Sequence, residues 1–262
     1  MSVHWQYEII EQTHSTNTDL LNRWHARTLV EPTALLAVSQ TAGRGRRGNQ
    51  WNSNAHESLT FSLAYPFPSS YTMMDLQGLT LACGVCLMNS LCQISGINPT
   101  VARALGLGLK WPNDLLLGER KMGGILVEGG QKDDNAPLWM IIGIGLNLSL
   151  SPNTAPSFAH ANLTDLHPAM QINLQDIWRQ LCLDLGDMLD IFQAEGFVPF
   201  QPQWNAWHAW KNQLVSLKQE DRILINGACL GVNASGHLQI QSDNITQDIT
   251  SGELTLRKFR HA

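Results

Sequence analysis

Residues 40–51 read QTAGRGRRGNQW, and residues 105–128 read LGLGLKWPNDLLLGERKMGGILVE. In the second stretch, two groups of turn-forming residues separate apolar runs at 105–111, 115–117 and 124–128. This pattern predicts three short strands joined by tight turns. The first stretch is a loop rich in glycine and arginine, and it directly follows another apolar run at 34–39. The two stretches therefore predict a strand-rich region that carries a cationic loop.

The rest of the sequence predicts more strands and three helices. Further strands are expected at 5–10, 59–64 and 137–150. A helix should begin at Ser15-Thr16-Asn17, where Thr16 and Asp19 have capping-box spacing. Apolar residues at helical spacing predict two more helices, over 76–95 and 174–192.

The C-terminal third of the chain has a different pattern. Residues 151–170, rich in Pro, Asn, Ser and Ala, are expected to form a mobile loop. From about residue 212, short apolar runs alternate with glycines, which predicts a small β-barrel of about 50 residues. Trp204, Trp207 and Trp210 precede it at a spacing of three and are expected to pack in the core or between domains.

The charge of the chain is slightly negative and unevenly distributed. It has 17 Lys and Arg against 22 Asp and Glu among 262 residues, a net charge of −5, so bulk attraction to nucleic acid is not expected. The short segments 43–48 and 110–121 nevertheless hold six of the 17 cations: Arg44, Arg46, Arg47, Lys110, Arg120 and Lys121. This clustering predicts one local site for an anionic ligand.

Cysteine and hydropathy patterns predict a cytoplasmic protein. Five cysteines at irregular spacing, with no secretory signal in residues 1–30, favour reduced thiols. Cys83 and Cys86 form a C-x-x-C pair in the middle of a predicted helix, without metal-ligand partners, and are expected to be buried. Residues 76–102 lack Asp, Glu, Lys and Arg, but polar residues interrupt them, so a buried helix is predicted instead of a membrane span.

The cationic loop and the Lys-Trp-Pro-Asn-Asp turn are the candidate chemical motifs. Residues 43–48 match G-x-G-x-x-G, but polar residues follow where a dinucleotide fold needs an apolar helix, and the kinase motifs are absent. Arginine side chains in such a loop suit phosphate or carboxylate, although a solvated turn or an RNA-binding segment remains open. Asp114 could hold Mg²⁺ in a turn flanked by Lys110 and Lys121, or the turn could be a plain hairpin. The sequence contains no G-x-S-x-G and no H-E-x-x-H motif, so it does not indicate a catalytic nucleophile on the protein.

Taken in order, five motifs resemble those of the biotin protein ligases, and the resemblance covers nearly the whole chain. They are Ser15-Thr16-Asn17, residues 40–48 with Trp51, residues 110–114, residues 121–128, and Gly143-Ile144-Gly145-Leu146-Asn147. Gly231-Val232, Gly236, Leu238, Ser251-Gly252-Glu253 and Arg257 are similar to the SH3-like end domain of that family. The resemblance implies an α+β fold: a catalytic domain over residues 1–211, with a mixed sheet flanked by helices, and an SH3-like β-barrel over residues 212–262.

The resemblance also implies a reaction and its participants. Biotin would react with ATP, in the presence of Mg²⁺, to give biotinyl-5′-AMP and pyrophosphate. A lysine of a biotin carboxyl carrier protein would then take the biotinyl group and release AMP. The first nucleophile is biotin itself, which agrees with the missing catalytic triad. Nucleic acid and membrane are not expected as partners, and pairing as a homodimer is left open.

Roles for individual residues follow from the same resemblance. Catalysis would fall to Lys121, beside the carboxylate–phosphate junction, and to Arg46, on the phosphate side. The residues implied to bind biotin are Ser15, Thr16, Asn17, Gln40, Gly43, Arg44, Gly45, Arg46, Trp51, Lys121, Gly123 and Gly124. Those implied to bind the nucleotide are Arg46, Arg47, Lys110, Trp111, Asn113, Asp114 and Asn147, with Asp114 also the candidate metal ligand.

Two departures and two rival functions accompany this interpretation. The first motif begins at residue 15, so a helix-turn-helix domain is not expected before it and a repressor role is disfavoured. Asn49-Gln50 stand where the family often has basic residues, which would alter loop closure. We expect residues 43–54 to order only over bound ligand. The rivals are a lipoate or octanoate ligase and a non-enzymatic module that senses biotin or binds nucleic acid.

Overall fold

A computed structural model describes residues 3–150, 159–168, 173–219, 222–250 and 254–259 of the chain. Its strands are β1 (Gln6–Thr13), β2 (Thr33–Gln40), β3 (Gly43–Arg44), β4 (Gln50–Trp51), β5 (Ser58–Phe67), β6 (Leu107–Lys110), β7 (Asp114–Leu117), β8 (Arg120–Gly130), β9 (Leu138–Asn147), β10 (Leu214–Gln219), β11 (Arg222–Val232), β12 (Leu238–Ser242), β13 (Ile245–Ile249) and β14 (Leu254–Lys258). Its helices are α1 (Thr16–His25), η1 (Arg46–Gly48), α2 (Leu79–Ser95), α3 (Pro99–Ala104), α4 (Leu163–Leu166), α5 (Leu174–Glu195), η2 (Val198–Phe200) and α6 (Gln201–Trp207).

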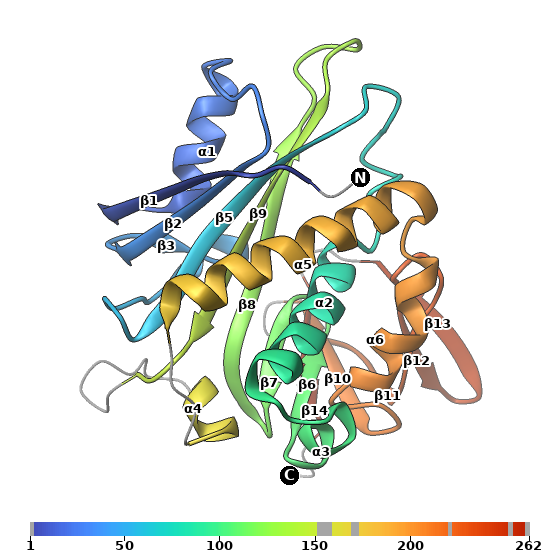
Figure 1. Ribbon diagram of the computed structural model, residues 1–262. Helices are drawn as coiled ribbons and strands as arrows, with labels where there is room; N and C mark the ends of the chain where they lie inside the picture. The colour runs from blue at the N-terminus through green and yellow to red at the C-terminus, as the bar shows by residue number, and fades with distance from the viewer. Residues whose placement is uncertain (1–2, 151–158, 169–172, 220–221, 251–253, 260–262) are drawn as a thin grey trace.

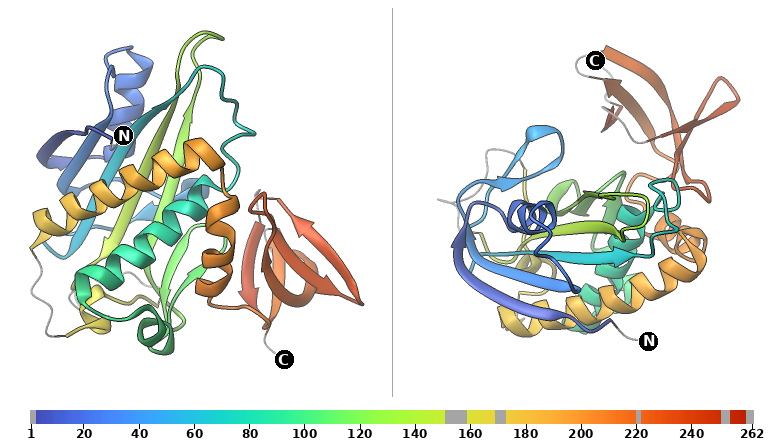
Figure 2. Two further views of the ribbon diagram at one scale, coloured as in Figure 1. Left: turned by 45° about the vertical axis from the view of Figure 1, so that its right-hand side comes forward. Right: turned by 90° about the horizontal axis from the view of Figure 1, so that it is seen from above.

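The larger sheet has seven strands in the order β1-β2-β5-β9-β8-β7-β6. β1 and β2 are parallel and the other neighbours are antiparallel, so the expected mixed sheet is confirmed. α5 and α2 cover one face of the sheet, and α1 lies on the other (Figures 1 and 2). The molecule is thus an α+β protein whose sheet has a helix-covered face and a face that α1 covers only in part.

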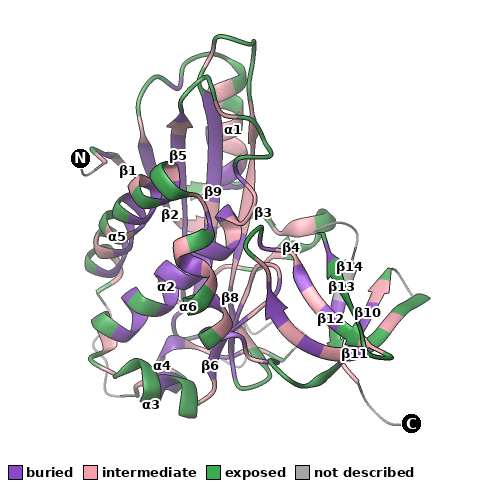
Figure 3. Ribbon diagram, turned by 90° about the vertical axis from the view of Figure 1, so that its right-hand side faces the viewer, coloured by how far each residue is buried: buried purple, intermediate pink, exposed green. Residues whose placement is uncertain are grey.

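Alternation along β5 and β9 explains why the two faces differ. Leu59, Phe61 and Leu63 on β5 lie in the main hydrophobic core beneath α2 and α5, and on β9 every second residue does the same. The intervening residues point to the α1 face. Thr60, Ser62, Gly143 and Gly145 are small or polar and line a cavity, whereas Ala64, Trp139 and Ile141 pack with Leu20 of α1. Figure 3 shows that buried residues extend along β5, β9 and α2. The same strands therefore support a core on one face and an open pocket on the other.

The C-terminal strands form a separate five-stranded antiparallel sheet in the order β13-β12-β11-β10-β14. It lies beside α6 (Figure 2). The antiparallel strands agree with the sequence prediction, and their described pairings leave β13 and β14 as the edges of a sheet. Ser251-Gly252-Glu253, one motif of the resemblance, lie outside the described residues. The division into residues 1–211 and 212–262 stays a prediction, although β10 begins close to that boundary.

Two expectations from sequence need correction. The strand expected over 105–111 begins only at Leu107, because α3 precedes it and Gly106 turns the chain with a φ of 95°. Of the loop expected over 151–170, residues 151–158 and 169–170 lie outside the described residues. The described part contains α4, which Asn162 and Asp165 hold with a capping box.

The cysteines and tryptophans behave as expected. All five cysteines are buried and free, and burial raises the pKa of Cys86 to about 12. Trp204, Trp207 and Trp210 are buried as well. No helix in the described part of the chain is both long and apolar enough to cross a membrane.

His208 connects the two sheets. Its Nδ1 donates to the carbonyl oxygen of Leu109 on β6 at 3.2 Å, and its Nε2 lies 3.0 Å from Cys229 Sγ on β11. Burial lowers the pKa of His208 to about 4. A neutral ring therefore joins the edge of the large sheet to the C-terminal sheet.

This buried histidine predicts acid sensitivity. In the unfolded chain His208 binds a proton near pH 6.5, but in the folded chain only near pH 4. Because the unfolded state binds more protons between these values, stability should fall as pH falls through this window, by about 3 kcal/mol. Urea denaturation of wild type and His208→Gln at pH 7 and pH 4.5 measures this. The variant should be less stable at pH 7 but lose less on acidification. Equal losses would contradict the assignment.

Candidate active site

A cavity of about 550 Å³ opens on the α1 face of the large sheet. It extends from the N-terminus of α1, across β5, β9 and β8, to the turn before β7 and the C-terminal sheet. The following residues, all named from sequence, line it: Ser15, Thr16, Asn17, Gln40, Arg44, Gly45, Arg46, Arg47, Trp51, Lys110, Trp111, Asn113, Asp114, Lys121 and Gly124. Gly43, Gly123 and Asn147 do not line it. Motifs more than 100 residues apart thus meet around one cavity.

Glycines on β9 make the floor of this cavity. Gly143 pairs with Ser62 on β5 and Leu126 on β8, so its backbone is fixed on both sides. A Cβ at Gly143 would lie 2.3 Å from Asn17 Oδ1. A Cβ at Gly145 would lie 2.4 Å from Cε2 of the Trp51 indole. Both glycines are needed because side chains from α1 and β4 approach the backbone closely.

Polar side chains at the start of α1 form one wall. Ser15 caps the helix, and Gln40 Oε1 accepts from the Thr16 amide at 2.8 Å. Ser62 Oγ lies 2.7 Å from Thr16 Oγ1 and donates to Asn17 Oδ1 at 2.7 Å. Because these residues are largely buried and fix one another, the wall presents hydrogen-bonding groups in a defined geometry. Such a wall suits a small polar ring.

Glu128 extends this network towards the cationic loop. It accepts from Asn17 Nδ2 at 3.0 Å and forms an ion pair with Arg44 at 2.6 Å. Arg44 therefore ties the loop to β8. Glu128 was not among the residues assigned to the site from sequence, although it ends the motif at 121–128.

The opposite part of the cavity is cationic. Asp114 accepts from Lys121 Nζ at 2.6 Å and lies 3.6 Å from Lys110 Nζ, so one carboxylate holds two lysines in place. Lys121 Nζ also lies 5.8 Å from the centre of the Trp51 ring. Burial lowers the pKa of Lys110. The two ammonium groups are thus held together at the cavity wall.

Arg46 adds a further cation from η1. Its Nη1 donates to Asn113 Oδ1 at 3.5 Å, and Asn113 in turn donates to the carbonyl oxygen of Ile125 at 3.0 Å. Burial, and then the neighbouring charge of Arg47, lower the pKa of Arg46. The described loop has a defined conformation over the cavity. That it orders only on ligand binding stays a prediction.

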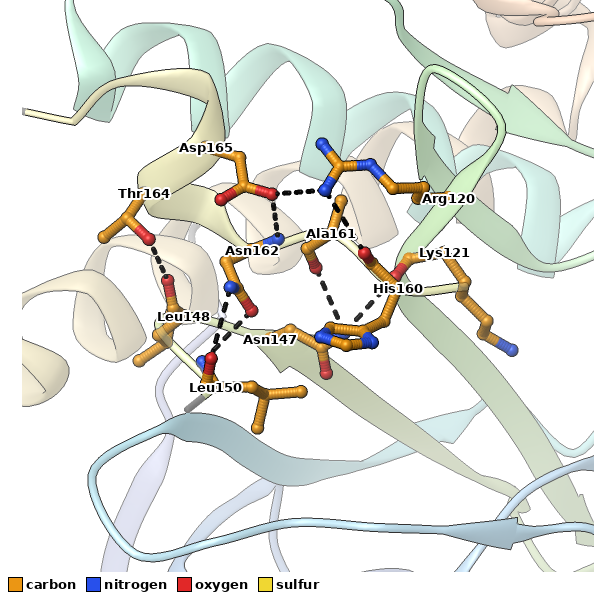
Figure 4. A network of polar contacts seen from close by, with 10 residues as sticks. All are labelled: Arg120, Lys121, Asn147, Leu148, Leu150, His160, Ala161, Asn162, Thr164 and Asp165. Carbon is orange, nitrogen blue, oxygen red and sulfur yellow. Dashed lines mark hydrogen bonds and ion pairs between the residues drawn. The ribbon is translucent and has the colours of Figure 1, made fainter. Parts of the chain in front are cut away.

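Asn147 holds the backbone around Lys121, and its expected role in nucleotide binding stays a prediction. Its Nδ2 donates to the carbonyl oxygens of Lys121 at 3.3 Å and Ala161 at 3.1 Å. Figure 4 shows it within a network that joins β8, β9 and the segment before α4. Arg120 and Asp165 close the network with an ion pair of 2.9 Å. Asn147 is therefore placed to position Lys121.

The two lysines that pair with Asp114 limit how far this carboxylate can serve as a metal ligand. No group of three or more potential metal-ligating side chains occurs in the described ranges. The described cavity lining has two carboxylates, Asp114 and Glu119, and Asp114 is already paired with two lysines. Mg²⁺ commonly binds through substrate phosphates with few protein carboxylates, which fits this lining better than a protein cage.

Three lining residues, Trp210, Leu256 and Arg257, come from the C-terminal part of the chain and were not assigned to the site from sequence. Trp210 lies just before β10, and Arg257 lies on β14. Sequence spacing gives no signal for Trp210, because the packing of the two sheets brings it to the cavity. For Arg257, the resemblance indicated only a place in the end domain.

The comparisons place the chain among known proteins. Residues 9–147 match the model of the Biotin/lipoate A/B protein ligase family. The Bifunctional ligase/repressor BirA of Escherichia coli (strain K12) is 30% identical over 247 residues, which are 93% of this chain and 71% of that protein. The Biotin--[acetyl-CoA-carboxylase] ligase of Mycobacterium tuberculosis is 33% identical over 147 residues, 56% of this chain and 51% of that protein.

Solved structures agree in fold. The biotin protein ligase of Aquifex aeolicus in complex with biotin and ATP is 24% identical. It superimposes with a TM-score of 0.74 and covers 98% of this chain and 99% of that one.

Proposed function

The chain belongs to the biotin/lipoate A/B protein ligase family, and on that premise we propose that it is an ATP-dependent biotin protein ligase. The observation that carries the proposal is the single cavity that joins a hydrogen-bonding wall at α1 to the cluster of Lys121, Lys110 and Arg46. The wall suits the ureido ring of biotin, and the cations suit the triphosphate of ATP.

In the first step, a carboxylate oxygen of biotin attacks the α-phosphorus of ATP. A new P–O bond forms, the bond to the β-phosphate breaks, and pyrophosphate leaves. Two unit charges 4 Å apart repel by about 4 kcal/mol at an effective dielectric constant of about 20. Lys121 beside the carboxylate and Arg46 beside the phosphate offset this repulsion and stabilise the charge at phosphorus.

In the second step, an unprotonated lysine amine of the acceptor attacks the carbonyl carbon of biotinyl-5′-AMP. An amide forms, AMP leaves, and the amine loses its proton. The acceptor implied by this enzyme class is a biotin carboxyl carrier domain. Asn113, Asp114 and Trp111 line the nucleotide half and would orient AMP, while Mg²⁺ neutralises phosphate charge when bound with ATP.

The decisive experiment is transfer of labelled biotin to a purified carrier domain with ATP and Mg²⁺. We expect label on the carrier that depends on its acceptor lysine. Competition by lipoate in ATP–pyrophosphate exchange separates a lipoate ligase from a biotin ligase. Salt-dependent binding to polynucleotide without AMP formation would support the nucleic-acid module instead.

Replacement of Arg46 by glycine tests the cationic loop. The variant loses a charge that faces the phosphate half, so we expect adenylate affinity to fall by about 100-fold. Chromatography of the biotinyl-5′-AMP that is released into solution measures this loss of adenylate affinity. Arg27→Gly, which removes an exposed arginine paired with Asp133 away from the cavity, is the control. Equal retention by wild type and Arg46→Gly would contradict the role of Arg46.

Three further properties are part of this proposal. We propose a cytoplasmic location, in agreement with five free cysteines. We also propose that the enzyme acts without nucleic acid, since its net charge is −5.

The third property is the pairing of two copies as a homodimer. Sedimentation with and without biotin and ATP tests it.

A further inference from the structure

The linker between α6 and the C-terminal sheet runs along the edge strand β6. The Ala209 amide donates to the carbonyl oxygen of Leu109 at 2.9 Å, and His208 donates to the same oxygen. On the other side, the Asn212 amide donates to the carbonyl oxygen of Cys229 at 2.7 Å. Because it is bonded to both sheets, the linker places Trp210 directly beside Lys110.

Trp210 has three properties that a packing residue alone does not need. Its ring lines the active-site cavity although only 7% of the residue is exposed. Its centre lies 5.1 Å from Lys110 Nζ. Its Nε1 has no hydrogen-bond partner among the described residues. The indole therefore offers a π face to a cation at the nucleotide half of the cavity.

Lys110 needs such a partner. Its side chain is 12% exposed, and the charged groups that face it are Asp114 on β7, Lys121 on β8 and Arg257 on β14. Asp114 favours the ammonium form, but it lies closer to Lys121. Lys121 and Arg257 oppose a second positive charge. The Asp114 carboxylate is thus shared by two lysines in a largely buried site that also contains an arginine.

We propose that Trp210 is a positioning residue for adenylation, whose ring face holds the Lys110 ammonium group in place for the phosphates of ATP. The inference rests on the proposed ligase function, because it assigns Lys110 to ATP. A cation over an aromatic ring is favoured by the ring quadrupole, and burial strengthens the interaction. Loss of the ring should let the Lys110 side chain move and so weaken ATP binding.

The test is the steady-state kinetics of biotin-dependent ATP–pyrophosphate exchange in wild type, Trp210→Leu and Trp210→Phe. We expect Trp210→Leu to raise the KM for ATP by about threefold to tenfold with a smaller change in kcat. Trp210→Phe keeps a π face and should restore most of the wild-type KM for ATP.

Two controls separate positioning from general packing. Trp207→Leu removes a buried tryptophan three residues away that does not line the cavity, so it should lower the melting temperature without raising the KM for ATP. In a Lys110→Met background, Trp210→Leu should cause little further change in the KM for ATP.

The outcomes are distinct. An unchanged KM for ATP in Trp210→Leu would overturn the inference, whereas biotin-dependent exchange by the wild type would still support the ligase function. Equal defects in Trp210→Phe and Trp210→Leu would also overturn it, because the π face would then not matter. A wild-type protein without biotin-dependent exchange would overturn the proposed function and this inference with it.

Discussion

Replacement of Lys121 by glutamine is expected to reduce the kcat of biotin-dependent ATP–pyrophosphate exchange by about a thousandfold. Lys121 Nζ lines the cavity, 2.6 Å from Asp114 and 5.8 Å from the centre of the Trp51 ring. In the proposed reaction, negative charge accumulates beside Lys121 when the biotin carboxylate approaches the α-phosphate. Glutamine keeps the length and a hydrogen-bond donor but removes the charge, so the loss reports electrostatic stabilisation.

The effect should appear mainly in kcat, because the charge at phosphorus is greatest in the transition state. Lys132→Gln is a matched control: Lys132 donates to the carbonyl oxygen of His25 and lies over Trp24, away from the cavity. Melting temperatures of both variants exclude unfolding as the cause. If Lys121→Gln kept more than about a tenth of the wild-type kcat, Lys121 would not hold the position at the reacting atoms proposed for it.

The sequence predicted the strands and the motifs of the site well for a physical reason. On β5 and in the second half of β9, large apolar residues alternate with small or polar ones, and this alternation is a local signal for a strand. The turn at 112–114 and the loop at 43–48 also have local signals. Short elements such as α3 and α4 were missed, because a single helical turn has little periodicity and depends on capping contacts.

Residues that reach the site through packing between sheets could not be predicted in this way. Trp210 enters the cavity because its linker is bonded to β6 and β11, and neither bond has a sequence signature. Asn147 shows the converse: its motif was recognised, but its amide serves the backbone of Lys121. Sequence spacing identifies which residues matter together, whereas hydrogen-bond partners decide what each one does.

Replacement of Gly143 by alanine should close the part of the cavity that we propose binds biotin. The new Cβ would lie 2.3 Å from Asn17 Oδ1, and the backbone cannot retreat because β5 and β8 hold β9 on both sides. Asn17 must then move and give up its hydrogen bonds to Ser62 and Glu128. We expect the KM for biotin to rise by about 100-fold, while the KM for ATP changes little.

A double-mutant cycle with Asn17→Ala shows whether this clash is the cause. Asn17→Ala alone loses the same hydrogen bonds, and with the clash removed Gly143→Ala should cost little more, so the two effects should be far from additive. In the double variant the alanine side chain at position 143 has space, because the Asn17 side chain is gone. The experiment therefore stays informative if Gly143→Ala alone folds poorly. Additive increases in the KM for biotin would mean that the two residues act independently, and the glycine floor would then not be what shapes the biotin site.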